Sequence, residues 1–150
     1  MYQIVEIGDP ILREQAVEVR RFNRNLYQLL DEMRETLYEA DGCGLAAPQI
    51  GISKQVVIVD IGDGPIELIN PKIIAAEGED EDVEGCLSIP GKSGIVKRAW
   101  KVTVAAQDRF GQPFTIEGEG LLARAFQHEI DHLKGILYVD KMEREVEYEE

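Results

Sequence analysis

The sequence has few of the residues that bind metals or form disulfides, with only two histidines and two cysteines among 150 residues. Two cysteines are too few for a disulfide scaffold, which excludes the small secreted domains that depend on several bridges. No apolar run approaches the roughly 20 residues of a membrane-spanning helix, and Met1 to Glu6 lacks a secretory signal pattern. We therefore expect a cytoplasmic protein with reduced cysteines and no membrane partner.

Basic residues are also scarce, since 16 lysines and arginines face 29 aspartates and glutamates, for a formal net charge of −13. Such a charge disfavours binding to phosphate backbones and anionic membranes, so we expect no specific nucleic-acid partner. A chain of 150 residues that is 44% hydrophobic suits one folded unit. The sequence predicts a single catalytic domain over residues 1–150, with an acidic tail at about 143–150.

Both histidines lie in one stretch of five residues, His128-Glu129-Ile130-Asp131-His132. Residues four apart share one face of a helix, so the two imidazoles would project toward one point. This H-E-x-x-H pattern supplies two metal ligands and a carboxylate suited to be the general base for a water molecule. The pattern indicates a metal-dependent hydrolase that still needs a third ligand.

The segment from Gly120 to Gly135 is apolar over much of a helical circumference, which predicts that the helix is buried. Buried imidazoles need polar partners, and a shared metal ion would satisfy them. The alternative is a pair of ordinary polar residues on a helix, because short motifs also match by chance. Cys43 and Cys86 are candidate third ligands, although free cysteines are more often small buried apolar residues.

Hydrophobic periodicity predicts the main elements. A helix that begins near Asn23 or Asn25 and ends before Asp41 is indicated by apolar residues at spacings of three and four: Leu26, Leu29, Leu30, Met33 and Leu37. Runs rich in β-branched residues predict strands at 55–60, 66–69, 72–76, 100–105 and 113–117.

A turn is expected at 108–112, and the acidic stretch at 77–84 is expected to be a solvated loop or an edge. Strands in the middle of the chain and helices near its ends are typical of an α+β fold. We expect mostly antiparallel β-sheets packed around a central C-terminal helix that carries the HEIDH motif.

Three segments resemble the signature motifs of peptide deformylase, in the order that this family has them. They are GCGLAAPQ at 42–49, EGCLS at 84–88 and HEIDH at 128–132, and the start of the chain at 8–13 is also similar. H-E-x-x-H alone is moderately specific, whereas three motifs in this order are highly specific. The resemblance covers essentially the whole chain.

The resemblance implies a metal-dependent hydrolase that removes the formyl group from the N-formylmethionyl end of newly synthesised polypeptides and releases formate. It implies that Cys86, His128 and His132 bind one divalent metal ion. The family usually contains Fe(II) in the cell, and Zn, Ni or Co can occupy the site. A set of one thiolate and two imidazoles suits several of these metals, so the residues do not choose among them.

The resemblance also implies catalytic roles. Glu129 would be the general base, and Gln49 with the backbone N–H of Leu87 would stabilise the oxyanion. Gly44 would belong to a strand-like edge that pairs with the substrate backbone. The remaining residues expected to contact the substrate are Cys43, Gly85, Leu121 and Ala125.

Three charged residues are expected to support the metal site from outside. Glu84 and Arg98 would form an ion pair that fixes the Cys86 loop, and Asp131 would orient the site from behind. The alternative for all three is an ordinary surface charge. Arg124, one turn before His128, is expected to narrow the pocket or to reach solvent at its rim.

Two other functions remain open from the sequence. One is a small H-E-x-x-H metallopeptidase, which would take a Glu or a third His downstream as its third ligand. The other is a metal-binding paralogue without activity, which would lack some acid–base and oxyanion residues. Transient proximity to the ribosome is expected for an enzyme of nascent chains, but the acidic tail argues against docking on RNA through that end.

Overall fold

The structure is a computed structural model that describes residues 2–146. Its elements in chain order are η1 (Pro10–Arg13), α1 (Arg24–Glu39), β1 (Gly44–Ala46), η2 (Ala47–Ile50), β2 (Val56–Val59), β3 (Ile66–Glu77), β4 (Asp80–Cys86), β5 (Ile89–Arg98), β6 (Lys101–Gln107), β7 (Pro113–Glu119), α2 (Leu121–His132), α3 (Tyr138–Lys141) and β8 (Arg144–Glu145). Among these residues, no helix is long and apolar enough to cross a membrane.

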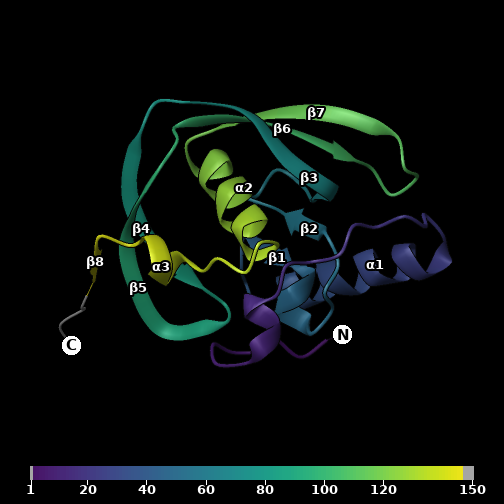
Figure 1. Ribbon diagram of the computed structural model, residues 1–150, viewed down its shortest axis with the longest axis horizontal. Helices are drawn as coiled ribbons and strands as arrows, with labels where there is room; N and C mark the ends of the chain where they lie inside the picture. The colour runs from purple at the N-terminus through teal and green to yellow at the C-terminus, as the bar shows by residue number, and fades with distance from the viewer. Residues whose placement is uncertain (1, 147–150) are drawn as a thin grey trace.

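Within residues 2–146 the strands form two antiparallel sheets. One has five strands in the order β1-β2-β3-β6-β7, and the other has three in the order β4-β5-β8. Helix α2 lies in the middle of the molecule, between the ribbon of β4 and β5 on one side and the sheet with α1 on the other (Figure 1). The predicted α+β fold with antiparallel sheets around a C-terminal helix is confirmed.

The five-stranded sheet is covered by a helix on each face. Along β2 the side chains alternate, so Val57 and Val59 pack in the cluster that contains α2, while Val56 and Ile58 pack in the cluster that contains α1. All four residues of β2 are buried. The period of two in a fully buried strand therefore fixes α1 and α2 on opposite sides of one sheet.

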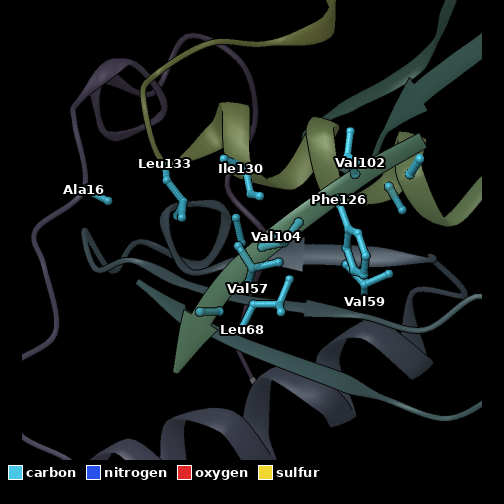
Figure 2. Packing of buried hydrophobic residues seen from close by; sticks show 13 residues of the cluster. Ala16, Val57, Val59, Leu68, Val102, Val104, Phe126, Ile130 and Leu133 are labelled. Atoms are coloured by element: carbon cyan, nitrogen blue, oxygen red, sulfur yellow. The ribbon is translucent and has the colours of Figure 1, made fainter. Parts of the chain in front are cut away.

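The cluster between α2 and the sheet holds the helix that carries both histidines. Phe126 and Ile130 of α2 point toward Val57, Val59 and the neighbouring strands (Figure 2). Phe126 is fully buried, and Ile130 is 2% exposed. Burial of these apolar groups fixes the rotation of α2 about its axis, so that its opposite, polar side faces the β4–β5 ribbon.

Helix α1 begins and ends as its sequence predicts. The Asn23 side chain accepts a hydrogen bond from the backbone N–H of Leu26 at 3.3 Å, which makes Asn23 the N-cap. The five predicted apolar positions are all buried against β1, β2 and β3. The predicted strands at 55–60, 100–105 and 113–117 correspond to β2, β6 and β7.

The structure corrects other details. The predicted strands at 66–69 and 72–76 are one strand, β3, which continues past Asn70 through an irregularity in its pairing with β6. Asn70 has φ of +51°, and its side-chain amide bonds to the backbone of Val19. The acidic stretch at 77–84 is mostly strand β4, so the loop alternative is wrong and the edge alternative is correct. Strand β5 was not predicted.

The C-terminal segment extends the small sheet. Arg144 and Glu145 form β8 and pair with Ile95 and Gly94 of β5. The predicted acidic tail at 143–150 therefore contains a short strand, and its residues 147–150 lie outside the described part of the chain. The short helix α3, which the sequence analysis did not assign, precedes it and packs against β5.

We expect Gly135→Ala to destabilise the protein more than Gly51→Ala. Both glycines have a positive φ, +75° and +82°, which costs an alanine about 1–2 kcal/mol. A Cβ at Gly51 would meet nothing within 4 Å, whereas at Gly135 it would lie 2.5 Å from the carbonyl oxygen of Arg13. Overpacking should add about 1–3 kcal/mol at Gly135 alone. Urea unfolding measures both, and equal losses would contradict the prediction.

Candidate metal centre and active site

Three side chains with metal-binding atoms converge between α2 and the tip of the β4–β5 ribbon. Ligand atoms of Cys86, His128 and His132 all lie within 4.8 Å of one another. Cys86 Sγ is 3.4 Å from His132 Nε2, and the two imidazole centroids are 5.1 Å apart. One thiolate and two imidazoles form a set that suits Zn²⁺ or Fe(II) and leaves coordination positions for water or substrate.

The geometry of the ribbon explains why Cys86 faces the helix. Strand β4 ends at Cys86, which pairs with Ile89 across the tight turn of Leu87 and Ser88. The register shifts between Glu84 and Cys86, and such an irregularity re-aims the side chains that follow it. Glu84 and Cys86 are consequently both directed at α2. Glu84 contacts His128, and Cys86 contacts His132 one turn further along the helix.

Glu84 lies at the centre of a buried cluster of charges. Its Oε1 is 2.8 Å from Nδ1 of His128. Arg98 donates one hydrogen bond of 2.8 Å to each carboxylate oxygen, from Nη2 to Oε1 and from Nε to Oε2. Burial alone would raise the pKa of Glu84, but hydrogen bonds from Arg98 and His128 hold this pKa well below its ordinary value. An ionised acceptor at Nδ1 favours the tautomer that leaves Nε2 of His128 free to bind a metal.

Arg98 also binds a second acidic residue, Asp131, and this contact connects the ribbon to α2. Its Nη1 donates to Asp131 Oδ2 at 2.7 Å, and Lys141 Nζ lies 2.9 Å from the same oxygen. Glu84, Arg98 and Asp131 are all buried. The structure therefore places these three residues behind the ligands rather than on the surface.

The structure decides between the two expectations for Arg124, because this residue is buried and lines the cavity. Arg124 is only 5% exposed and does not reach solvent at the rim. Its Nη1 donates to Glu84 and to the carbonyl oxygen of Val96, and its Nη2 donates to the carbonyl oxygen of Asp80. The alternative that it reaches solvent is wrong because three acceptors on the ribbon bind the guanidinium.

Two buried polar atoms next to the cluster lack partners. Glu129 Oε1 and His132 Nδ1 make no hydrogen bond within residues 2–146. Burial raises the pKa of Glu129 to about 7. Burial, together with the charges of His128 and Arg98, lowers the pKa of His132 well below its ordinary value. A metal ligand requires a neutral imidazole, and a carboxyl group with a pKa near 7 can act as a general base near neutral pH.

Gln49 is held rigidly beside the same group. It is 1% exposed, and its Oε1 accepts a hydrogen bond of 2.9 Å from the backbone N–H of Ala46. Its Nε2 donates to Ser88 Oγ at 3.2 Å and lies 3.5 Å from Cys86 Sγ. The amide N–H₂ group is therefore fixed toward the ribbon tip.

A cavity of about 620 Å³ opens onto these side chains. Most of the site residues predicted from the sequence line it: Cys43, Gly44, Gln49, Glu84, Gly85, Cys86, Leu87, Leu121, Ala125, His128 and Glu129. Arg98, Asp131 and His132 do not line it and lie behind its wall. Cys43 and Leu121 are exposed at the mouth, whereas Ala125 is buried.

The sequence analysis missed several residues of the cavity wall, among them Asp41, Asp60, Ile61 and Val83. Asp60 directly follows the buried strand β2, and its backbone N–H donates to the carbonyl oxygen of Cys43 at 2.9 Å. A signal existed, because antiparallel pairing of 56–59 with the GCGLAAPQ segment would have placed Asp60 beside Cys43.

Strand β1 is at the end of the five-stranded sheet, and among the described strands it pairs only with β2. Its free edge borders the cavity at Gly44. A Cβ at Gly44 would lie 2.6 Å from Glu129 Oε2, so only glycine allows the strand and the carboxylate to lie this close. An extended peptide added to this edge would pass directly in front of Glu129.

Three side chains that could hold a metal ion, beside a buried carboxyl group and faced by an open strand edge, form an arrangement typical of metal-dependent hydrolases. The comparisons with known proteins are more specific. A model of the family "Polypeptide deformylase" matches residues 1–147. The chain is 62% identical over 144 residues to the peptide deformylase of Desulfitobacterium hafniense, which covers 96% of each chain.

Solved structures of peptide deformylases are also similar to this chain. The crystal structure of a peptide deformylase from Legionella pneumophila superposes with a TM-score of 0.92 at 48% identity, over 95% of this chain and 86% of that one. The peptide deformylase from Thermotoga maritima gives a TM-score of 0.94 at 42% identity, over 96% and 99%. The chain belongs to the polypeptide deformylase family.

The family resemblance predicted from the three motifs is thus confirmed. Peptide deformylases are metal-dependent enzymes that remove the formyl group from the N-terminus of nascent peptides, so the predicted hydrolase function is confirmed at this level. Membership over nearly the full chain favours this function over a metallopeptidase or an inactive metal-binding paralogue.

We expect Gly44→Ala to lower kcat/KM strongly without removing the metal. The added Cβ would lie within 3 Å of three atoms of the Glu129 side chain, and the carboxylate must move to make room. A displacement of about 1 Å at a reacting group costs on the order of 100-fold in rate. Kinetics on a formylated peptide, with metal content and thermal stability as controls, measure this. Wild-type kcat/KM would show that the Glu129 position is not constrained by Gly44.

Proposed function

We propose that this chain hydrolyses the formamide bond of N-formylmethionyl peptides with side chains of α2, the β4–β5 ribbon and the β1 edge. The observation that carries the proposal is the convergence of Cys86, His128 and His132 within 4.8 Å, beside Glu129 at the end of an open cavity. The products are formate and a peptide with a free N-terminal amine.

Cys86, His128 and His132 would together hold one divalent metal ion. The donor set fits such an ion because both imidazoles are buried, His132 Nε2 lies 3.4 Å from Cys86 Sγ and Glu84 fixes Nδ1 of His128. When bound, the metal supplies Lewis acidity that makes a water molecule nucleophilic and polarises the formyl carbonyl. The family resemblance favours Fe(II) in the cell, and the same donors suit Zn, Ni or Co.

Glu129 would move the proton. Its carboxyl group accepts a proton from the attacking water and then delivers one to the amine nitrogen as the bond between carbon and nitrogen breaks. A pKa raised by burial to about 7 suits both steps near neutral pH, because a general acid–base catalyst is most effective when its pKa lies near the working pH.

Gln49 and Leu87 would stabilise the negative oxygen of the tetrahedral intermediate. The bond from Ala46 N–H to Gln49 Oε1 fixes which end of the amide faces the ribbon, so its N–H₂ group is preorganised as a donor. The backbone N–H of Leu87 belongs to the turn that follows Cys86 and lines the same cavity. Preorganised donors at a developing oxyanion are usually the largest single contribution to such catalysis.

The substrate backbone would add to the free edge of β1 at Gly44. Gly85 faces this edge from the ribbon, and an added Cβ there would meet only one atom within 4 Å. The methionine side chain would occupy the part of the cavity formed by Cys43, Leu121 and Ala125, a soft apolar environment that suits a thioether.

Glu84, Arg98 and Asp131 would act on the metal ligands without touching the substrate. Glu84 accepts from His128, and Arg98 ties Glu84 to Asp131, three residues after His128. Partners of this kind orient an imidazole ligand and raise its basicity.

We also propose that residues 1–150 form one catalytic domain that acts in the cytoplasm on nascent chains close to the ribosome. Apolar clusters on both faces of the five-stranded sheet, and a third between η1, β5 and α3, support a single unit. A formal charge of −13 disfavours stable association with nucleic acid or an anionic membrane.

Glu129→Gln should keep the metal and lose the chemistry. Glutamine is nearly the same size but cannot accept the proton from water, so kcat should fall by about 100-fold or more. Glu117→Gln, which changes an exposed carboxylate on β7 in the same way, is the matched control and should retain wild-type kcat. Near-normal turnover of Glu129→Gln would remove Glu129 from the mechanism.

Cys86→Ser should weaken metal retention, whereas Cys43→Ser should not. Cys43 lines the same cavity but does not belong to the group of Cys86, His128 and His132. Loss of a ligand should exceed the roughly 10- to 100-fold that removal of an outer contact costs in affinity. Elemental analysis after dialysis against a chelator compares the two variants. Equal metal content would argue that Cys86 is not a ligand.

Substrate choice should depend on the acyl group and on the first residue. Formyl-Met peptides should be hydrolysed well and acetyl-Met peptides poorly, because the acyl group would have to fit between Gln49, Leu87 and Glu129, where acetyl adds a methyl group. Replacing Met by Ala removes buried methylenes worth about 0.8 kcal/mol each, so kcat/KM for formyl-Ala peptides should fall roughly ten- to a few hundredfold. Mass spectrometry identifies the products. Cleavage of an internal peptide bond with the formyl group intact would contradict the proposed function.

A further inference from the structure

Arg124 belongs to the helix that carries the histidines and is the residue of the Glu84 cluster to which no role has been given. It lies four residues before His128, so both side chains leave the same face of α2. Its side chain is 6% exposed, and its guanidinium bonds to acceptors on two strands of the ribbon. A buried arginine this close to a ligand raises the question of what it holds in place.

The two oxygens of Glu84 divide the contacts between them. Oε1 accepts from Arg98 Nη2 and faces Nδ1 of His128, while Oε2 accepts from Arg98 Nε and from Arg124 Nη1. Each oxygen therefore has one partner from Arg98 and one from α2. Four contacts on two oxygens fix both the position of the carboxylate and the rotation of its plane.

Arg124 also fixes α2 relative to both ribbon strands. Val96 on β5 accepts from Nη1 at 2.9 Å, and the carbonyl oxygen of Asp80 on β4 accepts from Nη2 at 2.8 Å. A lysine has the same charge but cannot direct several donors of fixed geometry at acceptors on two strands. The planar fork is therefore the property of Arg124 that the structure uses.

We propose that Arg124 is a positioning residue for the metal ligand His128, and that it acts by fixing the plane of the Glu84 carboxylate. The proposal rests on the ligand assignment given above. Without Arg124, Oε2 keeps only the bond from Arg98 Nε, and Arg98 is itself shared with Asp131. Glu84 then loses one of its four contacts, so the plane of its carboxylate is fixed less tightly, and so is the imidazole of His128 that bonds to it.

A purely electrostatic role makes the opposite prediction for the metal. A buried cation near a metal site repels the metal, so removing the Arg124 charge would tighten metal binding if charge were its only effect. A positioning role predicts weaker binding in spite of this repulsion. The sign of the change therefore separates the two explanations.

The experiment compares Arg124→Met and Arg124→Lys in the Co(II)-loaded protein. Methionine keeps an unbranched stem against the cavity, and lysine keeps the charge without the fork. We expect both variants to release cobalt to a chelator about 10- to 100-fold faster than the wild type, as for loss of other outer contacts. The visible spectrum of bound cobalt should broaden or shift, while KM for a formyl-Met peptide should change little.

Arg109→Met is the matched control. Arg109 likewise binds carboxylates, those of Glu67 and Asp31, but its side chain is 24% exposed and it does not line the cavity. The Arg109→Met substitution should lower the free energy of unfolding and leave the cobalt release rate and the cobalt spectrum unchanged. If Arg124→Met does not fold, Arg124→Lys carries the test, because it keeps the buried charge.

A double variant tests the route through Glu84. In a Glu84→Gln background, Arg124→Lys should add little to the cobalt release rate, because both substitutions disturb one unit. Additive effects would overturn the proposed route, and tighter cobalt binding by Arg124→Met or wild-type release by Arg124→Lys would overturn the positioning role. His132→Ala distinguishes failure of the ligand assignment from failure of the positioning role. If this variant keeps stoichiometric cobalt, the ligand assignment is wrong, whatever the Arg124 variants do.

Discussion

The buried charge cluster built around the ion pair between Glu84 and Arg98 joins the β4–β5 ribbon to α2, the two parts of this molecule on which the site depends. Glu84 and Arg98 belong to the ribbon, and their remaining bonds go to His128 and Asp131 of α2. Burying charges is expensive unless each is paired and hydrogen-bonded. Because these groups satisfy one another only in this arrangement, a slide of the ribbon along α2 would leave charges buried without partners.

Two kinds of packing therefore meet at α2. Its apolar side fixes its rotation against the five-stranded sheet (Figure 2), and its polar side is fixed to the ribbon by charge. The proposed metal ligands come from both parts, since His128 and His132 belong to the helix and Cys86 to the ribbon. Glycine at 44 brings the β1 edge against Glu129. The substrate edge, the base and the ligands thus share one rigid frame.

The sequence predicted correctly those features whose pattern lies within a single helix or strand. The periodicity of α1, the β-branched run of β2 and the spacing of the two histidines each lie within one element. Strand β5 was missed because Pro90, Gly91 and Gly94 interrupt its pattern, although the ribbon pairs regularly beyond them. The burial of Arg124 was not foreseen because its acceptors are on strands far away in the sequence. The site residues were identified from sequence motifs, but the distances between them could be obtained only from the tertiary structure.

The most direct test of this account is X-ray absorption spectroscopy of the zinc-loaded protein. Convergence of the ribbon and α2 on one ion predicts a first shell with one sulfur at about 2.3 Å and two imidazole nitrogens at about 2.0–2.1 Å, completed by oxygen. A first shell without sulfur, or with a single imidazole, would show that Cys86, His128 and His132 do not share one metal, and would contradict the account.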